Sequence, residues 1–94
     1  MIKDVEVAMV HAANYALDYL DKKYNADVEE IIKQFLNEFN LDIKGDLKIY
    51  SVAAINEIIK MKIKNRNKSK KQLMQMFVNS IPEISRRIKE EEFE

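Results

Sequence analysis

Residues 46–64 read DLKIYSVAAINEIIKMKIK, and this stretch decides the expected fold. Its apolar residues fall on most sides of a helix; they are Leu47, Ile49, Tyr50, Val52, Ala53, Ala54, Ile55, Ile58, Ile59, Met61 and Ile63. A helix that is apolar around most of its girth is normally surrounded by other helices. Asp46 is a residue type that caps helix N-termini. The pattern therefore predicts a central helix over 46–64, inside an all-α bundle.

Two helices are expected before the central one. Over 2–24, apolar residues recur at spacings of three and four, and the alanines among them let a neighbouring helix approach closely. These residues are Ile2, Val5, Ala8, Met9, Ala12, Ala13, Ala16, Tyr19 and Leu20. Asn25 is the expected stop signal. Asp27 and Glu30 have capping-box spacing, which predicts a second helix over 27–40. In the short link 41–45, Gly45 suits the left-handed conformation at a helix end.

The basic stretch 63–71 is expected to form a polar loop after the central helix. The wider run 60–71 contains seven lysines and arginines and no acidic residue. Ser69 is followed three residues later by Gln72, which is again capping-box spacing. It predicts a short fourth helix over 69–77.

A fifth helix is expected over 81–91, after a tight turn at 78–79. Ser80 and Glu83 have capping-box spacing, and Pro82 in the first turn lacks only an amide hydrogen that is unpaired there anyway. The inner apolar residues of the last two helices are Leu73, Met74, Met76, Phe77, Ile81, Ile84 and Ile88. The sequence thus predicts one all-α domain over 1–94 with five helices (2–24, 27–40, 46–64, 69–77 and 81–91).

The composition supports a helical domain and excludes several protein classes. Hydrophobic residues make up 47% and charged residues 34% of the 94 residues, with one glycine and one proline, a globular balance with few tight turns. The chain has no cysteine, which excludes disulfides and thiolate metal sites. It has neither a signal-peptide core nor an apolar run near the roughly 18 residues of a membrane span. A soluble cytoplasmic protein without cofactor or membrane contact is expected.

Charge is distributed unevenly, although the formal net charge is zero. Residues 1–46 contain ten acidic and five basic residues, whereas residues 47–89 contain eleven basic residues against Glu57 and Glu83. Acidic residues at 90–94 restore neutrality. Such asymmetry favours a nucleic-acid-binding surface; solvated helix faces that merely differ in charge are the open alternative.

The last two expected helices have the features of a helix-turn-helix. The first of such a pair braces the second, whose outer face presents hydrogen-bond donors, and arginine suits both phosphates and guanine edges. The expected DNA-binding residues are Ser85, Arg86, Arg87 and Lys89 on the recognition helix, and Lys64, Arg66, Lys68, Lys70 and Lys71 in the basic stretch. Helix-turn-helix packing is also a common way to complete a helical domain, so a structural role is the alternative.

The segments SVAAINEIIK (51–60) and SKKQLMQMFVNSIPEISRRIKE (69–90) resemble the last three helices of a cyclin-type repeat of the transcription factor IIB family, in the style of archaeal transcription factor B. With ADVEEIIKQFLNEF (26–39), the resemblance extends over nearly the whole chain. It implies a five-helix cyclin-like orthogonal bundle ending in a helix-turn-helix, with Ile84 as core anchor and Arg87 and Lys89 at basic positions of the recognition helix. Because the chain has one repeat and no zinc ribbon, the resemblance implies a stand-alone relative, a regulator or a competitor rather than a protein with the full promoter-bridging role.

No catalytic group of residues is recognisable, and an enzyme is not expected. His11 is the only histidine, with no carboxylate three or four residues away, and Ser80 is a cap candidate rather than a nucleophile. No glycine-rich phosphate loop is present. The expected partners are double-stranded DNA and transcription proteins, or a second copy of the chain in a homodimer. Protein–protein interaction or self-association through the alanine-rich first helix, without nucleic acid, is the alternative function.

Overall fold

The computed structural model describes residues 2–38 and 46–92, with side chains described for 5–38 and 47–90. Its helices are α1 (Ile2–Lys22), α2 (Val28–Glu38), α3 (Asp46–Lys64) and α4 (Lys70–Glu92), and no strand occurs in these ranges. None of these helices is both long enough and apolar enough to cross a membrane. The all-α class and the first three helices are confirmed; the expected link 41–45, with Gly45, lies outside the described residues.

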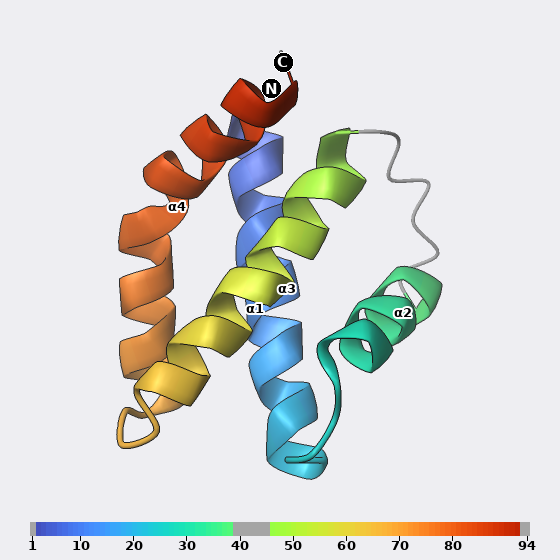
Figure 1. Ribbon diagram of the computed structural model, residues 1–94, viewed down its shortest axis with the longest axis vertical. Helices are drawn as coiled ribbons and strands as arrows, with labels where there is room; N and C mark the ends of the chain where they lie inside the picture. Colours follow the sequence, from blue (N-terminus) through green and yellow to red (C-terminus); the bar gives the residue numbers. More distant parts are fainter. Residues whose placement is uncertain (1, 39–45, 93–94) are drawn as a thin grey trace.

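α3 is the central helix of the bundle, as its sequence predicts. It contacts α1, α2 and α4, and Figure 1 shows α3 crossing in front of α1, with α2 on one side and α4 on the other. Ala54, Ile55 and Ile58 of α3 are completely buried. Most of the apolar girth of residues 46–64 is therefore covered by the other three helices, while Ile49 and Ile63 stay exposed.

Small side chains lie where α1 and α3 cross, which is the most extensive helix contact of the bundle. Ala12, Ala13 and Ala16 of α1 are completely buried, as are Ser51 and Ala54 of α3. Small side chains at a crossing let two helices approach closely. The alanine-rich face of α1 is thus covered within the chain and is not the part of this helix that a partner could reach.

α4 is one continuous helix, so the helix-turn-helix predicted for this part of the chain is wrong. The helix runs from Lys70 to Glu92 and passes through residues 78–79, where a tight turn was expected. The prediction of five helices is wrong for the same reason. The described residues form four.

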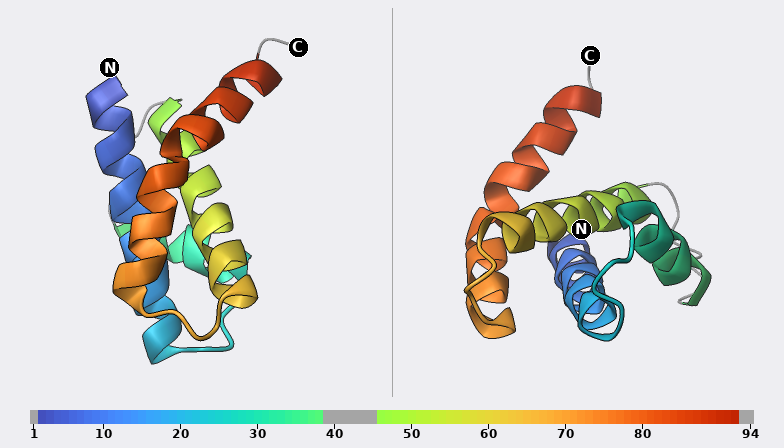
Figure 2. Two further views of the ribbon diagram at one scale, coloured as in Figure 1. Left: turned by 90° about the vertical axis from the view of Figure 1, so that its left-hand side faces the viewer. Right: turned by 60° about the horizontal axis from the view of Figure 1, so that its bottom comes forward.

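Contacts around Pro82 explain how α4 passes through the predicted helix start. The Ser80 hydroxyl donates a hydrogen bond to the Met76 carbonyl at 3.0 Å instead of capping a free amide. Pro82 has no amide hydrogen to donate to the Val78 carbonyl, and its ring crowds the preceding turn. Both features bend helices, and Figure 2 shows the second half of α4 turned away from the first.

The bend lets both halves of α4 bury an apolar face. Leu73, Phe77 and Ile81 lie in the core, and so do Ile84 and Ile88 beyond the bend. These residues follow one another at spacings of three or four, so they form one uninterrupted stripe. Burying each such side chain stabilises the fold by about 1.5–3 kcal/mol. Together they outweigh the cost of about 3 kcal/mol for a proline inside a helix.

Candidate nucleic-acid interface

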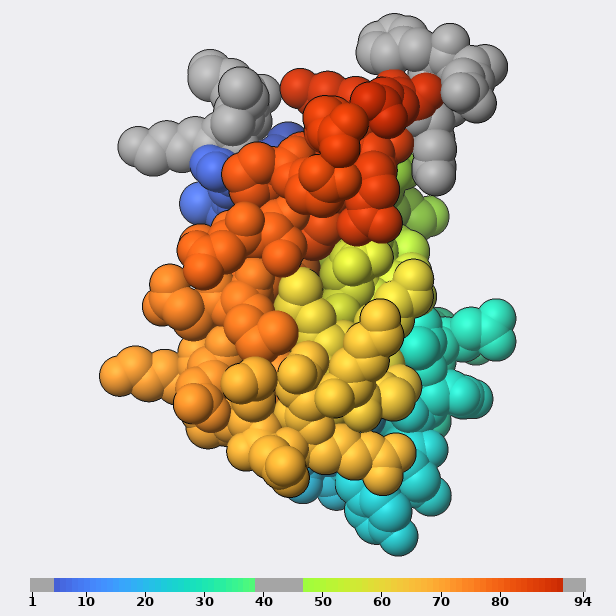
Figure 3. Space-filling view, turned by 60° about the vertical axis from the view of Figure 1, so that its left-hand side comes forward, coloured from blue at the N-terminus to red at the C-terminus, as the bar shows by residue number. Residues whose placement is uncertain are grey.

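Five cationic side chains lie around the connection between α3 and α4 and are here named the basic corner: Lys62, Lys64, Arg66, Lys68 and Lys71. Among the described residues, none of them has a carboxylate within salt-bridge distance. All except the half-buried Lys62 are exposed. Figure 3 shows this connection at the lower end of the face that α3 and α4 form together. The basic corner is therefore open to an external anion.

Hydrogen bonds hold the loop 65–69 in place. The backbone amide and the side-chain amide of Asn65 both donate to the Met61 carbonyl at 2.9 Å, and the Lys68 amide donates to the Asn65 carbonyl at 3.0 Å. The Gln72 amide donates to Ser69 Oγ at 3.2 Å, and the Ser69 amide donates to Gln72 Oε1 at 2.9 Å. The capping box predicted here is confirmed. None of these bonds uses a cationic side chain, so the loop does not depend on the charges it presents.

Two other lysines of the run 60–71 are ion-paired within the protein. Lys60 Nζ lies 3.9 Å from Glu57 Oε2, one helical turn earlier on α3. The Lys70 ammonium pairs with the Asp18 carboxylate of α1. Lys70 was predicted to contact DNA with its neighbours, but this pairing joins the start of α4 to α1 and separates Lys70 from the basic corner.

Ser85 and Arg86, predicted as DNA-contacting residues, both have partners inside the protein. The Ser85 hydroxyl lies 3.9 Å from Met9 Sδ of α1, so it faces the interior of the bundle. Arg86 Nη2 donates to both oxygens of Glu83 at 2.8 Å, and its Nη1 donates to Glu90 at 3.2 Å. The hydrogen bond from Arg86 lowers the pKa of Glu83, and the pKa of Arg86 is raised in turn. The guanidinium is neutralised by its own helix.

Arg87 and Lys89 are the other two residues that were predicted to contact DNA from this helix, and their side chains lie in different environments. Arg87 Nη2 lies 3.5 Å from Glu57 Oε2, so this arginine faces α3. Lys89 is exposed and has no carboxylate at salt-bridge distance within the part of the chain that the structure describes. The four predicted residues of α4 therefore do not share one outward donor face of the kind that reads bases.

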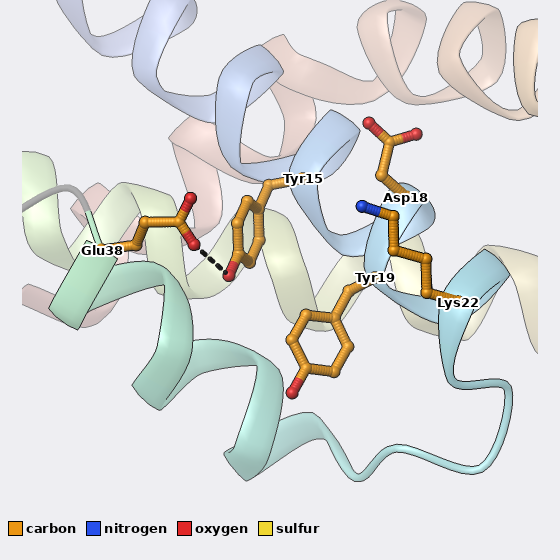
Figure 4. Close-up of a pocket in the computed structure, with 5 residues that line it drawn as sticks. All are labelled: Tyr15, Asp18, Tyr19, Lys22 and Glu38. Carbon is orange, nitrogen blue, oxygen red and sulfur yellow. Dashed lines mark hydrogen bonds between the residues drawn. The ribbon is translucent and has the colours of Figure 1, made fainter.

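A pocket of about 360 Å³ lies between α1 and α2 and is lined by Tyr15, Asp18, Tyr19, Lys22 and Glu38, none of which belongs to the basic corner. Figure 4 shows both tyrosine rings extending from α1, with Glu38 reaching Tyr15 from α2. The Tyr15 hydroxyl donates to Glu38 at 3.1 Å. Burial, together with this hydrogen bond, raises the pKa of Tyr15 to about 12.

Tyr19 extends the connection between these helices. Its hydroxyl donates to Glu30 at 2.7 Å, and Lys23 Nζ lies 2.8 Å from the same oxygen. Hydrogen bonds from Lys23 and Tyr19 lower the pKa of Glu30, and the bond to Glu30 raises the pKa of each partner. Glu30 is thus used to tie α2 to α1, rather than to complete a capping box with Asp27. The polar groups at this site act as a joint between helices.

Sequence spacing alone does not reveal the roles of Glu57 and the two tyrosines. Glu57 is the only acidic residue between 47 and 82, and this isolation within a basic region is the available signal. The contacts of Tyr15 and Tyr19 with α2 depend on how α1 and α2 cross. No local pattern in the sequence carries that information.

An apolar groove of about 450 Å³ runs between α1 and α4. It is lined by Glu6, Val7, Val10, His11, Asn14, Val78 and Ile81. Val7 is 64% exposed and Val78 is 44% exposed. His11 lies at the edge of this groove, with its ring centroid 5.9 Å from that of Phe35.

Among the side chains of residues 5–38 and 47–90, no three from His, Asp or Glu lie close enough together to hold a metal ion. No protein-family model matches the chain, and neither a curated protein nor a solved structure gives a significant match to it.

Proposed function

We propose that this domain is a binding module rather than an enzyme, and that it holds double-stranded DNA by the phosphate backbone at the basic corner. The observation that carries this proposal is the presence, within residues 62–71, of five cations without a carboxylate partner among the described residues. A cation that is already paired with a carboxylate must give up that contact to bind a phosphate, whereas an unpaired cation gains the phosphate contact without losing another. Binding also releases the counterions condensed on the phosphates.

The composition of the basic corner favours backbone contacts over base reading. Four of its five cations are lysines, which act as point charges toward phosphate and lack the planar fork that pairs with a guanine edge. The run 60–71 contains no aromatic residue on which unpaired bases stack. Double-stranded DNA bound without sequence preference therefore fits this surface better than a single strand.

The exposed apolar side chain of Ile63 makes an anionic membrane the main alternative to DNA as the partner of the basic corner. This side chain is 59% exposed between Lys62 and Lys64. Stable attachment to a membrane surface requires a larger apolar face than one side chain supplies. We therefore favour nucleic acid as the partner. Vesicles that contain phosphatidylserine are included in the test below to detect binding to a membrane.

A fluorescence-anisotropy titration with a short labelled DNA duplex tests the proposal. We expect binding at about 50 mM salt and a loss of affinity by about 200 mM, with a log–log slope near −0.9 for each phosphate neutralised, or about −4.5 for five contacts. No binding to the duplex at about 50 mM salt, or binding to anionic vesicles alone, would contradict the proposed function.

Matched double variants locate the contact. Lys64→Gln with Lys68→Gln neutralises two cations of the basic corner, and we expect the slope to become shallower by about two. Lys33→Gln with Lys48→Gln removes the same charge from exposed positions on α2 and α3, away from this corner. If both pairs weaken binding equally, net charge alone governs affinity and the basic corner is not the site.

A transcription-associated role stays a prediction from the resemblance to the transcription factor IIB family. Binding to the phosphate backbone does not require it.

The groove between α1 and α4 favours self-association as a second candidate function. The exposed side chains of Val7 and Val78 give this surface its apolar character, and such surfaces often bind protein. Sedimentation should then show a dimer that Val7→Asp converts to a monomer. A monomer at every concentration would exclude this candidate.

A further inference from the structure

Glu57 holds two cations on the face that carries the basic corner. Its Oε2 atom lies 3.9 Å from Lys60 Nζ and 3.5 Å from Arg87 Nη2, and its side chain is 21% exposed. One carboxylate between two cations from different helices resembles the setting of a bound phosphate, which also accepts charge-assisted hydrogen bonds from several donors.

The position of Glu57 continues the surface of the basic corner. Lys60 precedes Lys64 by four residues on α3, so the two side chains lie on the same side of that helix. Figure 3 shows the later half of α3 beside α4, directly above the loop 65–69. Glu57 is about 10 Å from Lys64 along the helix axis, at 1.5 Å per residue. A backbone strand held at the corner therefore reaches the Glu57 position with its neighbouring phosphates.

We propose that Glu57 occupies and blocks a second phosphate position, formed by Lys60 and Arg87, next to the basic corner. This inference rests on the proposed function. In the free domain, Glu57 pairs with both cations and cancels one of their two positive charges, so a phosphate entering here is repelled by the carboxylate and has to displace it. Glu57 thereby limits the bound DNA to the basic corner and keeps the affinity low.

Replacing the carboxylate with an amide tests this inference because Glu57→Gln changes the charge while keeping the size. We expect the variant to bind the labelled duplex several-fold more tightly at about 50 mM salt, and its log–log slope to steepen by about 1 to 2 as Lys60 and Arg87 reach phosphate. Glu29→Gln, at an exposed position on α2, is the matched control because it removes the same charge. It should leave the slope unchanged.

Arg87→Gln separates a blocked phosphate position from a general loss of negative charge. In the chain with Glu57, Arg87 is paired with the carboxylate and does not contact phosphate, so this variant should leave the slope unchanged and lower the affinity only slightly. In the Glu57→Gln background, the same change should remove most of the gain. Thermal unfolding of every variant shows whether the domain stays folded.

The outcomes for the inference and for the proposed function are distinct. If the unaltered chain binds DNA but Glu57→Gln has the slope of Glu29→Gln, then Glu57 only ties α3 to α4, and the inference is overturned while the proposed function stands. If only Glu57→Gln binds, the second phosphate position is supported, whereas the function proposed for the unaltered chain is overturned. If none of the variants binds, both ideas are overturned.

Discussion

The Tyr19 hydroxyl of α1 donates a 2.7 Å hydrogen bond to the Glu30 carboxylate of α2, and Lys23 meets the same oxygen at 2.8 Å. We expect Tyr19→Phe to lower the free energy of unfolding by about 1 kcal/mol, because the ring stays while a partly buried hydrogen bond is lost. Tyr24→Phe is the matched control, since the Tyr24 side chain is 88% exposed. Urea unfolding measures both, and equal stabilities would show that the hydroxyl contributes nothing.

Tyr15 should make the domain sensitive to alkaline pH. Its pKa is raised from 10.0 to about 12 in the folded state, so the folded chain keeps a proton that the unfolded chain releases near pH 10. The resulting stability is complete below pH 10 and is lost as the pH rises toward 12. We expect the melting temperature of Tyr15→Phe to fall less steeply over this range than that of the unaltered chain. Parallel curves would contradict this assignment.

Ser51→Ala should stabilise the protein. The Ser51 hydroxyl is completely buried and has no hydrogen-bond partner among the described residues. A buried polar group in this condition costs about 1–3 kcal/mol, and alanine is also the better helix former. We expect the free energy of unfolding to rise by about 1 kcal/mol. Ser51→Val adds volume where α1 and α3 cross and should destabilise by about 1–3 kcal/mol. A less stable alanine variant would mean that the hydroxyl is satisfied.

The second half of α4 should contribute to the core as strongly as the first. Ile84 is 2% exposed beyond the bend. We expect Ile84→Ala to lower the free energy of unfolding by about 2–4 kcal/mol through lost burial and a residual cavity. Val78→Ala, before the bend and 44% exposed, should cost less than about 1 kcal/mol. Similar small effects at both positions would show that α4 is not anchored beyond Pro82.

The fold could be predicted from the sequence where a local pattern is compatible with only one structure. A helix over 46–64 that is apolar on most sides is stable only when other helices surround it, and α3 has these bounds. The stretch Ser80–Glu83 has two meanings, since the same residues suit a helix start or a bent helix interior. The uninterrupted stripe from Leu73 to Ile88 favours the second meaning, because a turn at 78–79 would break its spacing.

The candidate site could be predicted only as a run of charge. The absence of acidic residues from 60–71 correctly indicates that the basic corner lacks carboxylates of its own. Which cations stay unpaired depends on other elements, because Asp18 of α1 pairs with Lys70 and Glu57 of α3 pairs with Arg87. These partners are distant in the sequence and adjacent only in the folded chain.

The formal net charge of the chain is zero, yet the basic corner holds five cations that no carboxylate of the described residues pairs with. A protein without net charge is not drawn toward a polyanion from afar, and the field of its individual charges fades within about 10 Å at 0.1 M salt. Close to the polyanion, the unpaired cations are attracted and exposed carboxylates such as Glu29 are repelled, so the molecule turns its basic corner inward. Encounters would therefore be governed by orientation rather than by long-range steering.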